Sequence, residues 1–200
     1  MEKEGQIWVS VITVCYTCRQ VIEQTMRSVL EQNYPFVEYI VIDGASKDGT
    51  KEEIERLAPL FREKGYRFHM ISEPDHGIYD AMNKGFRMAT GEIIGIINSD
   101  DLIAETTAIE KIVRCFEANS SVDAVYADLY YVAQSDTSKI VRYWKSGKHR
   151  PFAKGWHPAH PTFYVKKVVY EKSGLFDLGF KFAADFESVS YTHLTLPTIA

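Results

Sequence analysis

Apolar residues follow two alternating periods along the first 127 residues of the chain. Five stretches are β-branched, alternating or almost wholly apolar, as expected of strands: residues 7–14, 37–42, 67–72, 92–97 and 122–127. Between them, apolar residues recur every three or four positions, which predicts helices with one buried face over residues 21–30, 51–64, 78–89 and 107–116. Repeated strand–helix units predict a doubly wound α/β fold, with a Rossmann-like, mostly parallel sheet flanked by helices.

Threonine residues mark three of the predicted helix starts. Each is followed three residues later by Glu or Gln, the spacing of a capping box, in which each side chain binds the other residue's backbone N–H group. The pairs are Thr17 with Gln20, Thr50 with Glu53, and Thr107 with Glu110. We therefore expect these threonines to cap their helices.

The pattern becomes less regular after Ala127, in segments rich in Tyr, Trp, His and Pro. No linker or repeat interrupts the chain, so we expect one domain over residues 1–187, regular over 7–127 and less regular over 128–187. Residues 188–200 contain no Lys, Arg, Asp or Glu and have no helical period. They resemble translated sequencing-adapter read-through, and we expect the native reading frame to break near Ser188.

The composition is that of an ordinary globular protein, with 46% hydrophobic and 25% charged residues in a chain of 200. No apolar run approaches the roughly 18 to 20 residues that span a bilayer. The first apolar stretch is short and alternates, so it indicates a strand instead of a secretory signal. We therefore expect a cytoplasmic location.

Charge is spread unevenly along the chain. The net charge of −4 argues against nucleic-acid binding. Residues 139–172 nevertheless carry nine Lys or Arg against Glu171, a net charge of +8, which leaves −12 for the remainder. This basic segment is either a solvated face or a surface for anionic lipid or phosphate-bearing substrates, with peripheral contact at the inner face of the cell membrane.

Three cysteines are an odd number and do not suggest a disulfide framework. Cys15 and Cys18 have the spacing of a thioredoxin-like redox pair and lie between a predicted strand and helix. Two small residues at a tight turn account for the same pattern. The redox interpretation and the structural one both stay open at this point.

Polar residues follow each of the first four predicted strands. They are Thr13 to Thr17, Asp43, Ser72 to Asp75, and Asn98 to Asp101. Ligands of open α/β sheets bind beyond the carboxyl ends of the strands. We expect these four loops to meet at one crevice.

The familiar phosphate-binding loops are missing from that crevice. Gly44 and Gly49 have the spacing of a Walker loop, but Thr50 stands where its lysine belongs, and no Gly-x-Gly-x-x-Gly follows a strand. Asp100 and Asp101 instead end a buried strand with two carboxylates, which suit Mg²⁺ or Mn²⁺ bridging a diphosphate. The alternative is a polar turn that caps the next helix.

Four motifs then occur in order: Ser10–Val14, Val41–Thr50, Gly77–Gly85 and Ile97–Asp101. Each is weak alone, but together they resemble glycosyltransferase family 2, of the bacterial glycan-biosynthesis type, over about residues 7–187. The resemblance implies a GT-A fold, a nucleotide-sugar donor, a divalent metal and inversion at the sugar carbon. It also implies nucleotide-sugar binding by residues 7–127 and an acceptor side over 128–187.

The resemblance implies roles for the matching donor-side positions. Asp43 would contact the base or ribose, with Thr13 to Tyr16 forming the other wall of that pocket. Lys84 would line the donor site, although it can equally be a solvated helix residue. Asn98-Ser99-Asp100 occupies the Asp-x-Asp metal motif, where Asn98 replaces the first carboxylate and can bind ribose or a metal-bound water. Asp100 would then be the main metal ligand, with Asp101 beside it.

Direct inversion needs a base that takes the proton of the acceptor hydroxyl. The segment Ala184–Glu187 resembles the acidic motif that supplies it, which implies Asp185 as the base and Glu187 as second choice, against an ordinary surface carboxylate. A His-containing segment of the family lies on the acceptor side. His160 would contact acceptor or diphosphate, and Trp156 would stack on a sugar.

The expected function is inverting transfer of a sugar from a nucleoside diphosphate sugar, with UDP as the expected nucleotide, to a glycan or polyprenyl-linked acceptor in polysaccharide biosynthesis. Three alternatives remain from the sequence. A sugar nucleotidyltransferase needs a Gly-rich first loop, which Val14–Arg19 lacks. A redox protein would use Cys15 and Cys18, and a truncated domain would bind nucleotide without turnover.

Overall fold

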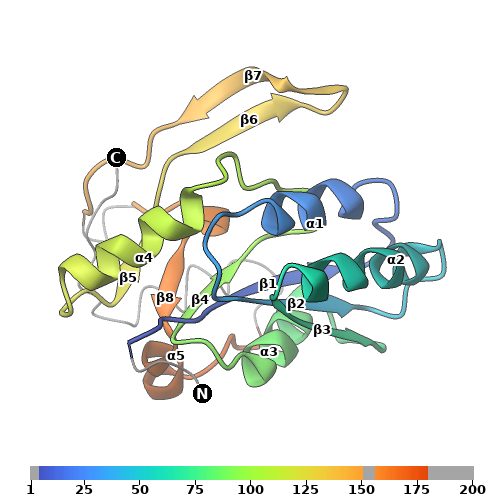
Figure 1. Cartoon of the computed structure of the whole chain (residues 1–200), viewed down its shortest axis with the longest axis horizontal. Helices are drawn as coiled ribbons and strands as arrows, with labels where there is room; N and C mark the ends of the chain where they lie inside the picture. Colours follow the sequence, from blue (N-terminus) through green and yellow to red (C-terminus); the bar gives the residue numbers. More distant parts are fainter. Residues whose placement is uncertain (1–4, 151–155, 180–200) are drawn as a thin grey trace.

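The computed structural model describes residues 5–150 and 156–179. A six-stranded sheet has the order β3-β2-β1-β4-β8-β5 (Figure 1). Its strands are β1 (Val9–Cys15), β2 (Val37–Asp43), β3 (Arg67–Ser72), β4 (Ile93–Ile96), β5 (Ala124–Val125) and β8 (Tyr164–Lys166). The helices are α1 (Ile22–Leu30), α2 (Thr50–Glu63), α3 (Ile78–Met88), α4 (Ala108–Ala118), α5 (Lys167–Ser173) and the short 3₁₀ helix η2 (His160–Thr162). A separate hairpin is formed by β6 (Leu129–Ala133) and β7 (Asp136–Trp144).

The topology of the sheet creates one switch point. Strand β1 pairs in parallel with β2 and with β4, and β3 extends the parallel part beyond β2. Strand β8 runs antiparallel to both β4 and β5. The predicted mostly parallel α/β sheet is thus confirmed. The chain proceeds from β1 outward to β3 and then returns to β4 on the other side of β1, and a ligand crevice is expected where the strand order reverses in this way.

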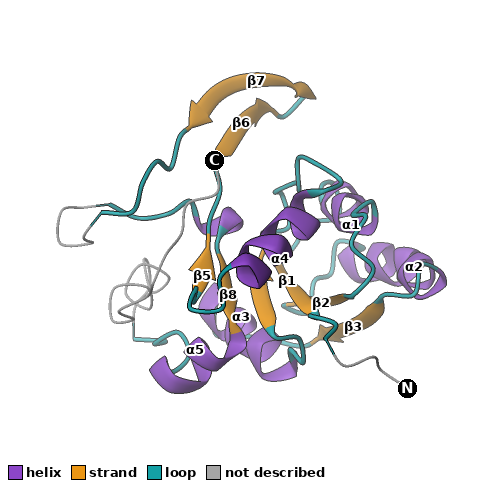
Figure 2. Cartoon of the chain, turned by 60° about the vertical axis from the view of Figure 1, so that its left-hand side comes forward, coloured by secondary structure: helices purple, strands orange, loops and turns teal. Residues whose placement is uncertain are grey.

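Helices cover the parallel sheet on both faces (Figure 2). Helices α1, α2 and α4 pack on the face that carries Val9 and Val11, whereas α3 packs on the face that carries Ile12 and Val14. Every residue of β1 and β2 is therefore buried. A strand covered on both faces has no solvated face, which explains why these segments are almost continuously apolar.

The capping-box predictions for α1 and α2 are wrong. Helix α1 begins at Ile22 without a side-chain cap, because Thr17 has a φ of 52° and donates its hydroxyl to the neighbouring carbonyl of Tyr16. Helix α2 includes Thr50 as its first residue, and Asp48 accepts bonds from the Thr50 backbone N–H and hydroxyl at 3.1 and 2.6 Å. Thr107 does occupy the N-cap of α4, but makes no side-chain cap bond.

The irregular second half completes the sheet and adds the hairpin. Strand β8 inserts between β4 and β5, and the β6–β7 hairpin stands apart from the main sheet in both views (Figures 1 and 2). Within residues 5–150 and 156–179, no helix has the length and apolar character needed to cross a membrane.

A buried carboxylate joins three elements at the amino end of the sheet. Glu38 on β2 is fully buried and accepts bonds from the Ser10 hydroxyl at 2.5 Å and from the Thr90 backbone N–H and hydroxyl, both at 2.7 Å. Burial alone would raise the pKa of Glu38, but these hydrogen bonds outweigh it and hold that pKa below its ordinary value.

Glu38→Gln is expected to lower the free energy of unfolding at pH 7 by about 1–3 kcal/mol, because hydrogen bonds to a charged acceptor are stronger than those to an amide. A pKa lowered on folding stabilises the native state above the ordinary glutamate pKa, and this contribution is lost as the pH falls through the folded value. The deficit of Glu38→Gln, measured by urea unfolding, should therefore shrink on acidification. The exposed Glu52→Gln on α2 is the control, and a deficit independent of pH would contradict this account.

Candidate functional site

Hydrogen bonds tie together the loops that follow β1 and β2. The backbone N–H of Thr17 donates to the Ser46 hydroxyl at 2.8 Å, and that of Cys18 donates to the Thr50 hydroxyl at 3.0 Å. The Gly44 N–H donates to the Cys15 carbonyl at 2.9 Å. The predicted convergence of these loops at the carboxyl edge of the sheet is present in the structure.

Two residues in these loops have backbone conformations that side chains rarely adopt. Thr17 and Ala45 have φ values of 52° and 59°. Such conformations cost on the order of 1–3 kcal/mol each and persist only where the surroundings impose them, commonly at ligand sites. Here the bond from Thr17 to Ser46 imposes the geometry on one of them.

Asp43 is the residue on which these loops depend. It is fully buried, and its carboxylate accepts bonds from the Ser46 hydroxyl at 2.5 Å, the Ser46 N–H at 3.1 Å and the Ser72 hydroxyl at 2.6 Å. Its carbonyl accepts the Glu73 N–H at 3.0 Å. The structure thus shows Asp43 as a positioning residue for the loops after β2 and β3, and its contact with a nucleotide stays a prediction.

The loops after β1, β2 and β3 pack closely together at Gly44. A Cβ atom at position 44 would lie 2.6 Å from the Asp75 carboxylate and 3.2 Å from the Tyr16 ring, so the absence of a side chain lets both groups pack against the Gly44 backbone. Tyr16 is 69% exposed. Thr13, by contrast, is fully buried and accepts the Tyr39 hydroxyl at 3.0 Å, so its side chain belongs to the core beneath these loops.

In the sequence, Asp75 stands out only as the last residue of a polar strand end, Ser72 to Asp75. Its carboxylate accepts the Gly77 N–H at 2.9 Å, at the start of α3, where the Gly77 φ of 111° favours glycine. What marks Asp75 as part of the site is the packing of its carboxylate against Gly44, a contact that only the fold reveals. Asp75 therefore joins Tyr16 as a candidate wall of the site.

Cys15 and Cys18 lie in the core under the first loop. Both thiols are free and buried, and they contact each other. Their mutual hydrogen bond raises the pKa of Cys15 and lowers that of Cys18. Because both thiols are buried in the core and neither is open to a redox partner, the geometry favours the structural interpretation over the redox one.

The acidic segment after β4 forms a tight turn. The Asp101 N–H donates to the Asn98 carbonyl at 3.1 Å, and the Asn98 side-chain amide donates to the Asp101 carboxylate at 2.8 Å. The Thr25 hydroxyl of α1 donates to the Ser99 carbonyl at 2.7 Å, which fixes the turn against α1. Asn98 thus orients Asp101, while Asp100 is exposed at the tip of the turn.

This turn fits a divalent cation bound together with a phosphate ligand. Burial raises the pKa of Asp101, its hydrogen bond from Asn98 opposes that rise, and the charge of Asp100 adds to it. A cation would relieve this repulsion. Among the described residues, no group of three or more His, Cys, Asp or Glu side chains could hold a metal ion. Mg²⁺-type sites commonly combine one or two carboxylates with waters and substrate phosphates, which matches this donor set.

Lys84 is engaged in shaping the loop before α3. Its ammonium group lies 3.0 Å from the Glu73 carboxylate and 3.8 Å from that of Asp80, and donates to the Pro74 carbonyl at 2.8 Å. Its side chain is only 17% exposed. Lys84 is therefore not the solvated helix residue of the alternative interpretation, and its contact with a donor stays a prediction.

Asn83, which the sequence analysis did not select, fastens the second half of the chain to α3. Its buried side-chain amide donates to the Phe176 carbonyl at 2.9 Å and accepts the Phe176 N–H at 3.0 Å. This pairing of a side chain with a backbone mimics one rung of a sheet. It places the segment ending at residue 179 on the face covered by α3.

The two predicted acceptor-side residues have different surroundings. His160 begins η2, which lies beside β4, so it is near the strand that carries the acidic turn. Trp156 donates its indole N–H to the Ser146 carbonyl at 3.1 Å and packs edge-on against Tyr126. Their contacts with substrate stay predictions. Asp185 and Glu187 lie outside the described residues.

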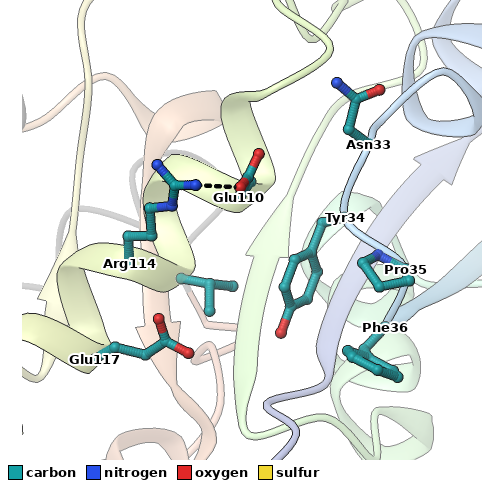
Figure 3. Close-up of a pocket in the computed structure, with 8 residues that line it drawn as sticks. Asn33, Tyr34, Pro35, Phe36, Glu110, Arg114 and Glu117 are labelled. Carbon is teal, nitrogen blue, oxygen red and sulfur yellow. Dashed lines mark hydrogen bonds and ion pairs between the residues drawn. The ribbon is translucent and has the colours of Figure 1, made fainter.

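A groove of about 290 Å³ lies elsewhere, between α4 and the segment before β2 (Figure 3). Tyr34 and Phe36 form one wall, and Glu110, Arg114 and Glu117 form the other. Phe36 precedes the first residue of β2, so the groove is at the amino edge of the sheet, opposite Asp43. It is not the predicted crevice.

Comparison with known proteins agrees with this arrangement. The model of "Glycosyl transferase family 2" matches residues 10–182. An uncharacterized glycosyltransferase of Haemophilus influenzae is 27% identical over 192 residues, which are 90% of this chain and 58% of that protein. The chain thus spans little more than half the length of that relative.

Two solved structures share the fold. The mannosyltransferase PcManGT from Pyrobaculum calidifontis, in complex with GDP-Man and Mn²⁺, has a TM-score of 0.70 at 24% identity and aligns with 94% of this chain and 51% of its own. S. aureus TarS 1-349 in complex with UDP-GlcNAc has a TM-score of 0.67 at 17% identity, with coverages of 97% and 59%. The expected GT-A fold is confirmed, and the chain belongs to glycosyl transferase family 2.

Proposed function

We propose that this chain is the donor-binding part of an inverting glycosyltransferase that uses a nucleoside diphosphate sugar, with UDP as the nucleotide. The observation that carries the proposal is the acidic turn Asn98–Asp101, held against α1 at the switch point of the sheet. Family membership favours glycosyl transfer over the nucleotidyltransferase and redox alternatives. Related folds that bind GDP-Man with Mn²⁺, or UDP-GlcNAc, support a nucleotide-sugar donor.

The nucleoside would bind against Tyr16 and Asp75, which both pack against Gly44. The exposed Tyr16 ring offers a stacking face, and the Asp75 carboxylate offers an acceptor for a base or ribose donor. Asp43 would hold the loops that carry these groups in place through its serine partners.

The diphosphate would lie toward the acidic turn, with Mn²⁺ or Mg²⁺ held by Asp100 and Asp101. When bound, such a cation neutralises the charge of the departing nucleotide. Asn98 fixes the orientation of Asp101, and Lys84 holds the neighbouring loop through Glu73.

The acceptor would be a glycan or polyprenyl-linked molecule in polysaccharide biosynthesis, with Asp185 taking the proton of its hydroxyl and Glu187 as the second candidate. His160 and Trp156 would face this acceptor side. A location in the cytoplasm, in peripheral contact with an anionic inner membrane face, fits a lipid-linked acceptor.

Asp100→Ala is expected to weaken Mn²⁺-dependent UDP binding by about tenfold or more, which is about 1.4 kcal/mol of binding free energy. Asp101→Ala should have a similar effect, because both carboxylates would face the cation. Isothermal titration of UDP with and without Mn²⁺ measures this, with Glu52→Ala as the control. Equal binding by Asp100→Ala and the wild type, or no binding by the wild type, would remove the metal-site assignment.

Asp43→Asn is expected to lower the free energy of unfolding by about 1–3 kcal/mol, because the Ser46 and Ser72 hydroxyls donate to different carboxylate oxygens and an amide nitrogen in place of one of them cannot accept. UDP affinity should fall with it. Ser72→Ala is the matched variant, since it removes one of these bonds and keeps the charge. Weakened binding without any loss of stability would show that Asp43 contacts the nucleotide and does not act by positioning the loops.

Asp185→Asn is expected to reduce release of UDP from a UDP-sugar by about 10²-fold or more, since a positioned base contributes roughly 10² to 10⁴. UDP affinity should be unchanged, which separates chemistry from binding. Glu187→Gln is the matched variant, with a smaller expected loss. Equal turnover by Asp185→Asn and the wild type would assign the base elsewhere, and no turnover by the wild type would favour a domain that binds nucleotide only.

A further inference from the structure

The β6–β7 hairpin is exposed on both of its faces. Every residue of β7 except Trp144 is exposed, and so are the three central residues of β6. An isolated two-stranded ribbon is marginally stable in water unless a helix, a further strand or a partner covers it. Among the described residues, β6 and β7 pair only with each other. The hairpin therefore has the properties of a surface that a binding partner covers when the protein functions.

One face of the hairpin is apolar. The strand register sets Tyr130 opposite Tyr143 and Val132 opposite Ile140, so these four side chains share a face. The two tyrosine rings stack at 5.0 Å. Their exposures range from 37% for Val132 to 56% for Ile140, and Val141, at the shift in register, is 60% exposed. These five residues are called the hairpin surface.

Positive charge lies along the chain in and after β7, whereas the exposed Asp136 at the start of β7 is acidic. Residues 139–150 contain five cations and no acidic residue, and all five side chains are exposed: Lys139, Arg142, Lys145, Lys148 and Arg150. The chain outside residues 139–172 carries −12, so positive charge is concentrated in this segment of the sequence. Tyrosines beside lysines and arginines are typical of the bilayer interface, where rings lie at headgroup level and cations contact anionic lipids.

The root of the hairpin is fixed to the body of the protein. Asp128 accepts the Ser146 N–H at 2.9 Å and the Tyr143 hydroxyl. The Ser146 hydroxyl donates to the Ala127 carbonyl at 2.7 Å, and the Tyr126 hydroxyl donates to the Gly147 carbonyl at 2.9 Å. The hairpin surface is thus held at a set position while its strands project outward (Figure 2).

We propose that the hairpin surface and its five cations dock this protein on an anionic lipid bilayer. A twofold contact between the hairpins of two copies would bring two sets of five cations together, so charge complementarity favours a lipid surface over a second copy. Membrane binding here does not use the donor site. Only the further statement, that docking brings the enzyme to a lipid-linked acceptor, rests on the proposed function.

Vesicle sedimentation of the full chain tests this, with vesicles of phosphatidylcholine alone and vesicles in which about a third of the lipid is phosphatidylglycerol. The wild type should bind only the anionic vesicles, and added salt should weaken binding. Replacing Lys139, Arg142 and Lys145 by Gln should weaken it about 100-fold, at a few-fold per cation. Ile140→Ser with Val141→Ser should weaken it at unchanged net charge.

The matched control replaces Lys51, Lys111 and Arg114 by Gln, which makes the same charge change on exposed positions of α2 and α4 and should leave vesicle binding near wild type. UDP titration of every variant separates the two proposals. Loss of vesicle binding at unchanged UDP affinity supports docking. A wild type that binds anionic vesicles but not UDP would also support docking, and would contradict only the donor proposal. Equal binding to both vesicle types, or wild-type binding by both hairpin variants, overturns the proposal. The proposal is also overturned if the protein does not bind vesicles and instead forms a dimer in solution that Ile140→Ser abolishes. A second copy of the chain would then be the partner.

Discussion

Burial of the parallel strands on both faces is the constraint from which the site follows. Strands β1 and β2 have no solvated side, since α1 and α2 cover one face and α3 covers the other. Polar groups that serve a ligand can then be placed only at the strand ends. Because the parallel strands point the same way, their carboxyl ends bring Tyr16, Asp43, Asp75 and the Asn98–Asp101 turn to one edge.

Hydrogen bonding turns this edge into a defined geometry. The carboxylate of Asp43 accepts hydrogen bonds from Ser46 and Ser72. Ser46 in turn holds Thr17 in its strained conformation. Asn98 plays the same part for Asp101, and Thr25 fixes the turn against α1. The residues best suited to contact a donor, Tyr16 and Asp100, are exposed above these buried supports. The site thus combines exposed side chains that can contact a ligand with buried, hydrogen-bonded side chains that hold them in position.

Periodicity predicted the regular elements well, because their burial is decided by neighbours within a few residues. The strand at 67–72 agrees at both ends, and the helix at 78–89 to within one residue. The capping of α1 could not be predicted, since Thr17 is held by Ser46, a residue that only the tertiary fold brings near. For the same reason Asn83 and Asp75 were not recognised: their partners, Phe176 and Gly44, are distant in sequence. The hairpin lacks a buried face, so its strands do not have the apolar runs that mark the buried strands of the main sheet.

The central claim is that donor and metal meet at the carboxyl edge of β1 and β4, and paramagnetic broadening by Mn²⁺ in the presence of UDP tests it most directly. In amide NMR spectra of the full chain, the account predicts loss of the signals of Asn98, Ser99, Asp100 and Asp101, with weaker effects at Tyr16 and Gly44. Signals of the amino-edge groove, such as Tyr34 and Glu117, should remain. Broadening centred on that groove, or spread evenly over the surface, would contradict the account.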